Sequence, residues 1–143
     1  MTTASITSEV YYPYTPERVW RALTTSAVIA RWLMPNTFEP RIGHHFTFQT
    51  NPMPAFGFDG VCHCEVTAYE EPRLLSYTFD GGALRTQVTY QLAPEGAGTR
   101  LRFEHSGFDL DDPVQRGSYQ GMQGWGQALE VGLLREIEAL PVA

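Results

Sequence analysis

The sequence predicts an α+β fold: a curved antiparallel sheet of about six strands, with two short helices after the first strand and a long C-terminal helix. Between residues 44 and 108, apolar and polar side chains alternate with a period of two, in segments joined by turn sequences such as DGG at 80–82. On either side, residues 15–33 and 118–140 show the spacing of amphipathic helices. No linker or internal repeat interrupts the chain, so residues 1–143 are expected to form a single domain.

The N-terminal part predicts one strand and two helices. A period-two pattern gives residues 5–12 one apolar side, which is typical of a strand. Thr15 is a natural N-cap, and Pro16 suits the first position of the helix that follows. A second short helix is expected from about residue 26 to residue 33, because Pro35 disfavours helical backbone before it.

The central part predicts the remaining strands, over residues 44–50, 58–70, 72–79, 85–92 and 100–108. Each of these segments has an apolar, often aromatic face and a polar or charged face. Because turns rather than helices join them, we expect an antiparallel meander. The apolar face of this sheet needs one cover, and only the C-terminal helix is long enough to supply it.

The C-terminal helix contains several glycines, although each glycine in a helix interior costs about 0.5–1 kcal/mol relative to alanine. These are Gly121, Gly124, Gly126 and Gly132. A helical wheel places an apolar stripe beside them, formed by Met122, Trp125, Leu129, Leu133, Ile137 and Leu140. Two explanations are open: the small residues allow the helix to pack closely on the sheet, or they leave space for an apolar cavity.

Composition excludes several classes of partner. Ten basic residues against sixteen acidic ones give a net charge of -6, which argues against nucleic-acid binding and against docking to an anionic membrane. No apolar run approaches the ~18 residues of a membrane span, so no membrane insertion is expected. The first residues lack a signal-peptide pattern, and Cys62 and Cys64 are too close in sequence to staple a fold. We therefore expect a cytoplasmic protein.

Four segments together carry a family resemblance: TPERVWRALTTSAVIARWL, EEPRLLSYTF, GTRLRFEHSGF, and Gly124-Trp125 with apolar positions after it. In this order and spacing the chain resembles the family of activators of heat-shock-protein-90 ATPase homologues, within the START-like (SRPBCC, Bet v 1-like) superfamily. The resemblance covers about residues 6–140. It implies one START-like domain with a helix-grip fold, in which an antiparallel sheet grips a long C-terminal helix around a cavity.

The resemblance also implies a function. Superfamily members bind lipids, sterols, polyketides and other apolar molecules, and a few catalyse cyclisation or dehydration. We therefore expect the partner to be a small apolar or amphipathic molecule, lipid, polyketide-like or aromatic, held in the internal cavity. No cofactor is expected. A homodimer or a protein partner stays open.

Two alternatives to ligand binding remain. The first is an enzyme of cyclase or hydrolase type that uses the same cavity; it is the less favoured, because no nucleophile elbow, phosphate loop, dinucleotide fingerprint or zinc-protease motif is present. The second is a protein-interaction module like the family's co-chaperones. Those proteins carry this domain beside a separate N-terminal domain that binds the chaperone. The sequence shows no such domain, so the family name alone does not predict chaperone stimulation.

The expected ligand-binding residues are inward-facing side chains of the strands and helices. They are Trp32, Phe46, Phe48, Cys64, Leu75, Tyr77, Phe79, Val88, Tyr90, Leu101, Phe103, His105, Met122, Trp125 and Leu129. The imidazole of His105 either orients a ligand or acts as a base, or it simply satisfies the core. The loops 35–43 and 51–57 are expected to border the mouth of the cavity.

No metal site and no catalytic residue are predicted. Alternation along the strand puts His63 on the face opposite Cys62 and Cys64, so the three cannot share a tetrahedral ion. Two buried thiols acting as small hydrophobic groups explain the cysteines better. The acidic residues around 109–112 are expected to solvate a loop and to favour the start of the final helix.

Overall fold

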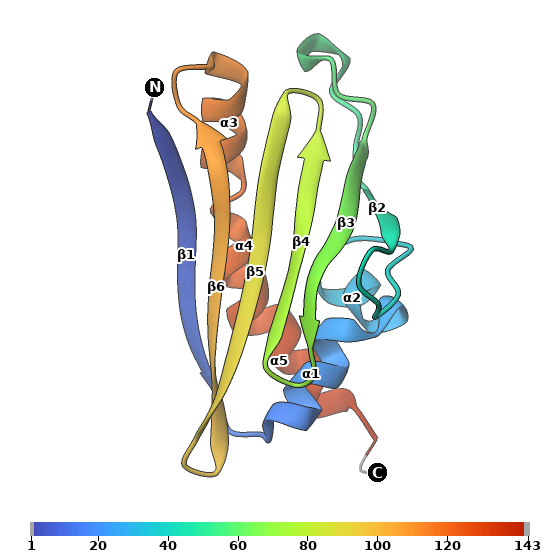
Figure 1. Ribbon diagram of the computed structural model, residues 1–143, viewed down its shortest axis with the longest axis vertical. Coiled ribbons are helices and arrows are strands. Elements are labelled where there is room, and N and C mark those ends of the chain that lie inside the picture. The colour runs from blue at the N-terminus through green and yellow to red at the C-terminus, as the bar shows by residue number, and fades with distance from the viewer. Residues whose placement is uncertain (1, 142–143) are drawn as a thin grey trace.

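The computed structural model describes residues 2–141, apart from the side chain of Phe56, and within them the strands form one antiparallel sheet (Figure 1). Its order is β1-β6-β5-β4-β3-β2. The strands are β1 (Thr3–Tyr12), β2 (His45–Gln49), β3 (Val61–Glu70), β4 (Leu74–Gly81), β5 (Leu84–Glu95) and β6 (Gly98–Asp109). The predicted meander is confirmed for β2 to β6, and β1 pairs with β6 at the edge.

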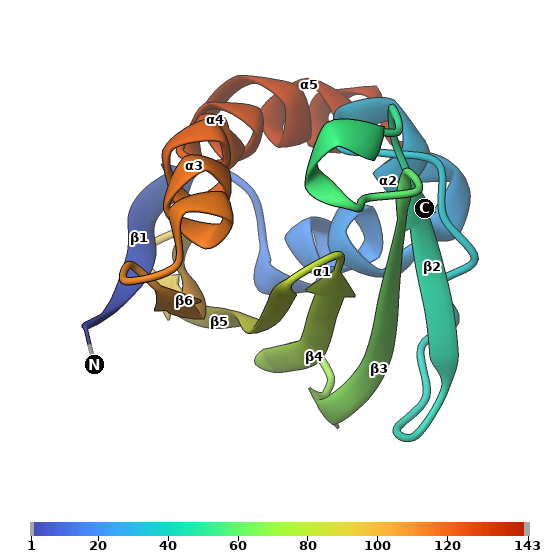
Figure 2. The same ribbon diagram turned by 90° about the horizontal axis from the view of Figure 1, so that it is seen from above.

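The sheet is curved, and the helices lie on its inner side (Figure 2). Alternation along each strand sends the apolar side chains inward, so β4 buries Leu75, Tyr77 and Phe79. The inward rings touch one another with centroids 5.3–6.0 Å apart, in the tilted and edge-on arrangements that aromatic pairs prefer. This aromatic core comprises Phe46, Phe48, Tyr77, Phe79, Tyr90, Phe103 and Trp125.

The two predicted short helices are confirmed as α1 (Pro16–Thr24) and α2 (Ser26–Trp32). The Thr15 side chain caps α1 by accepting a hydrogen bond from the backbone N–H of Arg18 at 3.3 Å. At the end of α2, the Trp32 indole is buried and donates to the Ala22 carbonyl at 3.2 Å. This bond ties the two helices together at one side of the aromatic core.

The C-terminal helix is confirmed, and the structure adds a break that the sequence pattern did not predict. The helix α3 (Pro113–Gly121) begins earlier than residue 118, because Asp112 caps it by accepting from the Val114 N–H at 3.0 Å. The chain leaves the helix at Met122 and Gln123. The segments α4 (Gly124–Gln127), η2 (Ala128–Leu133) and α5 (Leu134–Ala139) then follow without a gap.

The middle of this C-terminal helix, η2, is π-helical. In an α-helix, every four-residue step rotates the side chain by about 40°. The wider π turn reduces this drift, so the inward residues stay in line over a spacing of four: Trp125, Leu129, Leu133 and Ile137, all buried. The Tyr12 hydroxyl donates to the Leu129 carbonyl at 2.6 Å, and this buried bond fastens the end of β1 to η2.

Close packing explains two of the C-terminal glycines. A Cβ on Gly126 would lie 2.6 Å from the Ser8 hydroxyl oxygen, and one on Gly132 would lie 3.3 Å from the Cβ of Trp32. At Gly121 and Gly124, in contrast, a Cβ would meet nothing within 4 Å. Close packing therefore explains the glycines in the part of the helix that lies on β1 and α2, but not Gly121 and Gly124.

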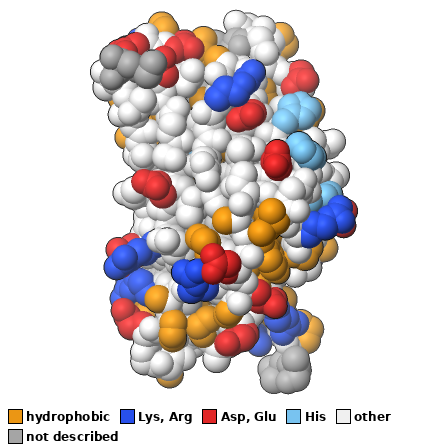
Figure 3. Space-filling model, in the orientation of Figure 1, with side chains coloured by type: hydrophobic (Ala, Val, Ile, Leu, Met, Phe, Trp, Pro, Cys, Tyr) orange, Lys and Arg blue, Asp and Glu red, His pale blue; other side chains and the backbone are white. Residues whose placement is uncertain are grey.

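The outward face of the sheet is polar. Figure 3 shows positive and negative side chains interspersed on it, without a large area of one sign. Arg100, for example, pairs with Glu95 at 2.6 Å and lies 3.9 Å from Glu9. Within residues 2–141, no helix combines the length and the hydropathy needed to cross a membrane.

Candidate functional site

A pocket of about 530 Å³ lies at one end of the molecule, between α3, the β4–β5 turn and residues 50–58. In Figure 2, α3 and the segment with η1 (Pro54–Phe56) stand on opposite sides of this end. The pocket reaches the surface, since Met53 and Ala83 in its lining are exposed. Its lining comprises Met34, Thr50, Met53, Phe58, Cys62, Phe79, Gly81, Gly82, Ala83, Leu84, Pro113, Val114, Gly117, Ser118, Gly121, Met122 and Trp125.

Several residues with little or no side chain line this pocket. Gly117 and Gly121 lie four residues apart on the pocket side of α3, and a Cβ on either would find no atom within 4 Å. Gly82 and Ala83 line the pocket from the β4–β5 turn. No neighbouring atom would meet a Cβ at these two positions, so the second explanation for the C-terminal glycines, that they leave space, stays open for α3.

Thioether and aromatic side chains supply much of the remaining lining. Thioethers come from Met34, Met53 and Met122, and rings from Phe58, Phe79 and Trp125. Methionine is unbranched and polarizable, so it adapts to the shape of a neighbour and makes favourable contacts with rings. The arrangement therefore suits an apolar molecule, and in particular one with an aromatic part.

One side chain fastens α3 to the rim of the pocket. Gln115 donates from Nε2 to the Ala83 carbonyl at 3.1 Å, and its Oε1 accepts from the Asp109 N–H at 2.9 Å. The Tyr119 ring meets the Phe108 ring edge-on at 5.3 Å between centroids. None of the residues of α3 is fully buried, so these contacts, the Asp112 cap and the chain connections hold the helix in place.

The lining carries no formal charge at neutral pH. Among the described residues that line the pocket, Cys62 is the one ionisable side chain, and burial raises the pKa of its thiol to about 11. The thiol is therefore protonated, and it acts as a small apolar group rather than as a nucleophile. A ligand with a buried charge would find no partner in this lining.

His105 lies directly beneath the pocket. Its ring contacts the rings of Phe79 and Trp125, both of which line the pocket, at 5.2 and 5.3 Å between centroids. The imidazole is fully buried, and burial lowers its pKa to about 4, so it is neutral at pH 7. Its Nε2 lies 2.8 Å from the Thr86 hydroxyl oxygen.

The structure brings three of the predicted binding residues into the pocket: Phe79, Met122 and Trp125. The other predicted residues are buried in the core and do not line this pocket: Trp32, Phe46, Phe48, Cys64, Leu75, Tyr77, Val88, Tyr90, Leu101, Phe103, His105 and Leu129. Contact of these side chains with a ligand stays a prediction. The physical reason for their position is that their large side chains, many of them aromatic, pack together and fill the middle of the space between the sheet and the C-terminal helix.

Of the two loops expected to border the mouth, one lies at this pocket and the other does not. Residues 51–57 do border the pocket through Met53. Residues 35–43 instead run along β2, where the Gln49 N–H donates to the Pro35 carbonyl and the Thr37 N–H to the Thr47 carbonyl. The sequence interpretation also missed Gly117, whose spacing of four from Gly121 was the available signal.

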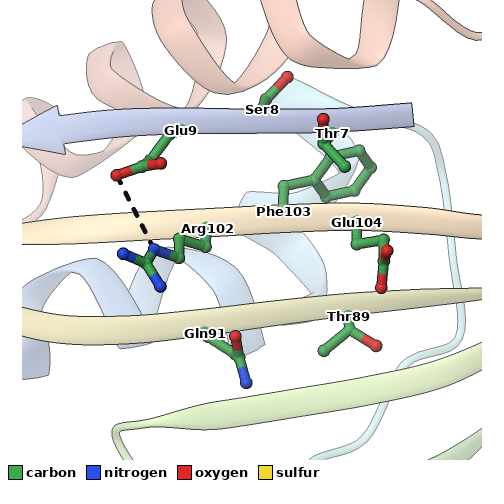
Figure 4. Close-up of a pocket in the computed structure, with 8 residues that line it drawn as sticks. All are labelled: Thr7, Ser8, Glu9, Thr89, Gln91, Arg102, Phe103 and Glu104. Carbon is green, nitrogen blue, oxygen red and sulfur yellow. Dashed lines mark ion pairs between the residues drawn. The ribbon is translucent and has the colours of Figure 1, made fainter. Parts of the chain in front are cut away.

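A second hollow, of about 440 Å³, lies on the outward face of the sheet across β1, β6 and β5 (Figure 4). Its exposed lining is polar and charged: Thr7, Glu9, Gln91, Arg102 and Glu104. Arg102 and Glu9 approach to 3.8 Å and offset each other's charge. This surface therefore differs in chemistry from the apolar pocket at the end of the molecule.

Comparison with known proteins decides the family. The family model described as "Activator of Hsp90 ATPase homolog 1-like protein" matches residues 13–134. The chain belongs to this family. No curated protein matches it significantly.

Several solved structures are similar to this member of the Hsp90 ATPase activator homologue family. Protein MLL2253 from Mesorhizobium loti is 36% identical with a TM-score of 0.83, and the match covers 97% of this chain and all of that one. Protein BH1534 from Bacillus halodurans is 32% identical with a TM-score of 0.75, over 96% of this chain and 99% of that one. CalU16 from Micromonospora echinospora, at 24% identity and a TM-score of 0.65 over 96% and 83%, shares the fold.

Proposed function

We propose that this chain binds a small, uncharged, mainly apolar molecule in the pocket beside α3. The observation that carries the proposal is the pocket itself: about 530 Å³, lined by apolar side chains and glycines. Sites for small molecules typically measure roughly 300–1,000 Å³ and have a mostly apolar lining. Gly117 and Gly121 contribute to this lining without a side chain that would occupy the space.

Affinity comes from burying apolar ligand surface, at roughly 25 cal/mol per Å² before the entropic costs of binding. The rings of Phe58, Phe79 and Trp125 and the adjacent thioethers favour an aromatic ligand over a plain acyl chain, because both groups attract ring faces and edges. Within the range of lipid, polyketide-like and aromatic molecules, we therefore place the ligand among the aromatic ones.

The proposal is tested by filling the pocket from α3. In Gly117→Leu, the new side chain extends into the open space without meeting another atom at its Cβ, so the helix stays intact. Gln120→Leu is the matched control, because Gln120 is exposed on the same helix and does not line the pocket. The neutral fluorescent probe N-phenyl-1-naphthylamine reports binding by its increase in emission.

The expected result is that wild type and Gln120→Leu bind the probe alike, whereas Gly117→Leu binds it about tenfold more weakly or not at all. Thermal unfolding of all three proteins shows whether each is folded. Equal binding by both variants would place the probe elsewhere, and a wild type that takes up no probe would end the proposal. Native mass spectrometry of the protein isolated gently from cells then identifies a co-purified ligand.

A further inference from the structure

Two buried side-chain nitrogens lack a hydrogen-bond partner within the described part of the chain, and they lie on neighbouring rings. They are Nδ1 of His105 and Nε1 of Trp125. The two rings meet edge-on, with centroids 5.3 Å apart and planes at 77°. Buried polar groups in native proteins nearly always have partners, and these two exceptions belong to rings that are in contact.

The hydrogen bonds around Thr86 fix which of these nitrogens accepts. The Thr86 hydroxyl has a single proton, which it donates to the Phe79 carbonyl at 2.6 Å. Its oxygen must therefore accept from His105, and Nε2 of the imidazole carries the proton at 2.8 Å. In the neutral ring, Nδ1 is then a bare acceptor. Trp125 offers the opposite character, since the indole N–H only donates.

The position of the pair links it to the pocket. Trp125 and Phe79 both line the pocket, and the rings of both contact the His105 ring. The Tyr90 hydroxyl lies toward the indole, but the two do not reach hydrogen-bond geometry, and Tyr90 is already paired with the Tyr77 hydroxyl at 3.0 Å. Within the described residues no hydrogen bond holds the Trp125 indole, and its ring forms part of the pocket wall.

We infer that the polar group of the ligand is a hydroxyl, which donates its proton to Nδ1 of His105 and accepts from Nε1–H of Trp125. This inference deepens the proposed function and rests on it. Among neutral groups, a hydroxyl both donates and accepts at one atom, whereas an ether or a carbonyl oxygen only accepts and a hydrocarbon does neither. The ligand class is thus a hydroxylated aromatic molecule such as a phenol or a naphthol.

The test compares 2-naphthol with 2-methoxynaphthalene, which has the same rings and an oxygen that cannot donate. Calorimetric titrations are made on wild type, His105→Phe and Tyr90→Phe. In His105→Phe we expect 2-naphthol to bind about tenfold more weakly, the equivalent of one hydrogen bond, while 2-methoxynaphthalene is unaffected. Tyr90→Phe leaves the imidazole in place and tests the nearby phenol as the alternative partner, so in this variant 2-naphthol should keep its preference over 2-methoxynaphthalene.

A second measurement needs no variant. In nitrogen-15 NMR spectra of the wild-type protein, 2-naphthol should shift the His105 Nδ1 resonance, and 2-methoxynaphthalene should leave it in place. If neither compound binds wild type, the proposed function and this inference both fail. If both bind and the Nδ1 resonance does not respond to naphthol, or if His105→Phe leaves the preference unchanged, the hydroxyl inference alone is wrong. Loss of the preference in Tyr90→Phe would assign the hydroxyl to Tyr90 instead.

Discussion

The buried imidazole of His105 predicts that stability falls as the pH is lowered from about 7.5 to about 5. The sign follows from proton binding. The unfolded imidazole takes up a proton below its ordinary pKa of 6.5, whereas burial keeps the folded one neutral until the pH approaches about 4. Acidification through this window therefore favours the unfolded chain.

The magnitude follows from the difference between the two pKa values. Each pKa unit corresponds to about 1.4 kcal/mol, so a shift from 6.5 to about 4 amounts to about 3 kcal/mol when fully expressed. Between pH 7.5 and 5 the expected loss is about 2 kcal/mol, since the folded ring is still neutral at the lower end. The side chains around the imidazole are uncharged: Thr86, Phe79, Phe108 and Trp125. Burial therefore sets the shift.

The assay is urea unfolding at several pH values, followed by tryptophan fluorescence, for wild type and for His105→Phe. All other ionisable groups are the same in the two proteins, so their effects cancel in the difference between the two free energies of unfolding. As the pH falls from 7.5 to 5, wild type should lose about 2 kcal/mol more of its free energy of unfolding than the variant does. A difference that stays constant over this range would show that the folded imidazole is protonated as easily as the unfolded one, and the account of its burial would be wrong.

Two further predictions concern the helix and its contact with β1. Gly117→Ala should raise the midpoint of thermal unfolding, by a stabilisation of about 0.5–1 kcal/mol, whereas Gly132→Ala should gain nothing or lower it, because its Cβ would lie 3.3 Å from the Cβ of Trp32. Equal shifts in both variants would show that Gly132 is no more closely packed than Gly117. Tyr12→Phe should cost about 1–3 kcal/mol in urea unfolding, since the Leu129 carbonyl would be left buried without its 2.6 Å partner; an unchanged midpoint would show that this carbonyl does not need the phenol.

The strands were predictable because their signal is local. Alternation in PRLLSYTF specifies which side of β4 is buried, and the structure buries Leu75, Tyr77 and Phe79. The caps were predictable for the same reason, since Thr15 and the acidic residues before Pro113 act within one helical turn. Each of these features depends on a few neighbouring residues and on a fixed backbone period.

The π-helical turn and the break at Met122 and Gln123 were not predictable from such a period. A helical wheel assumes one continuous α-helix, and it therefore joins Met122, Trp125 and Leu129 into one stripe. The structure separates Met122, which lies at the break, from Trp125 and Leu129, which are both buried on the helix that follows. The cause is tertiary, because the contacts of Gly126 with Ser8 and of Gly132 with Trp32 hold only the later part of the helix close to the sheet and α2.

This difference between the two parts of the helix explains why the space for a ligand lies at one end. After Gly124, buried leucines pack the helix onto the aromatic core. The glycines in this part allow close packing rather than leaving space for a ligand. Before Met122, α3 buries none of its residues fully and reaches the β4–β5 turn through Gln115. A glycine therefore has a different role in each part. Gly132 lets the helix approach Trp32 closely, whereas Gly117 lines the pocket without occupying it. A longer side chain should therefore disturb folding at position 132 and ligand uptake at position 117.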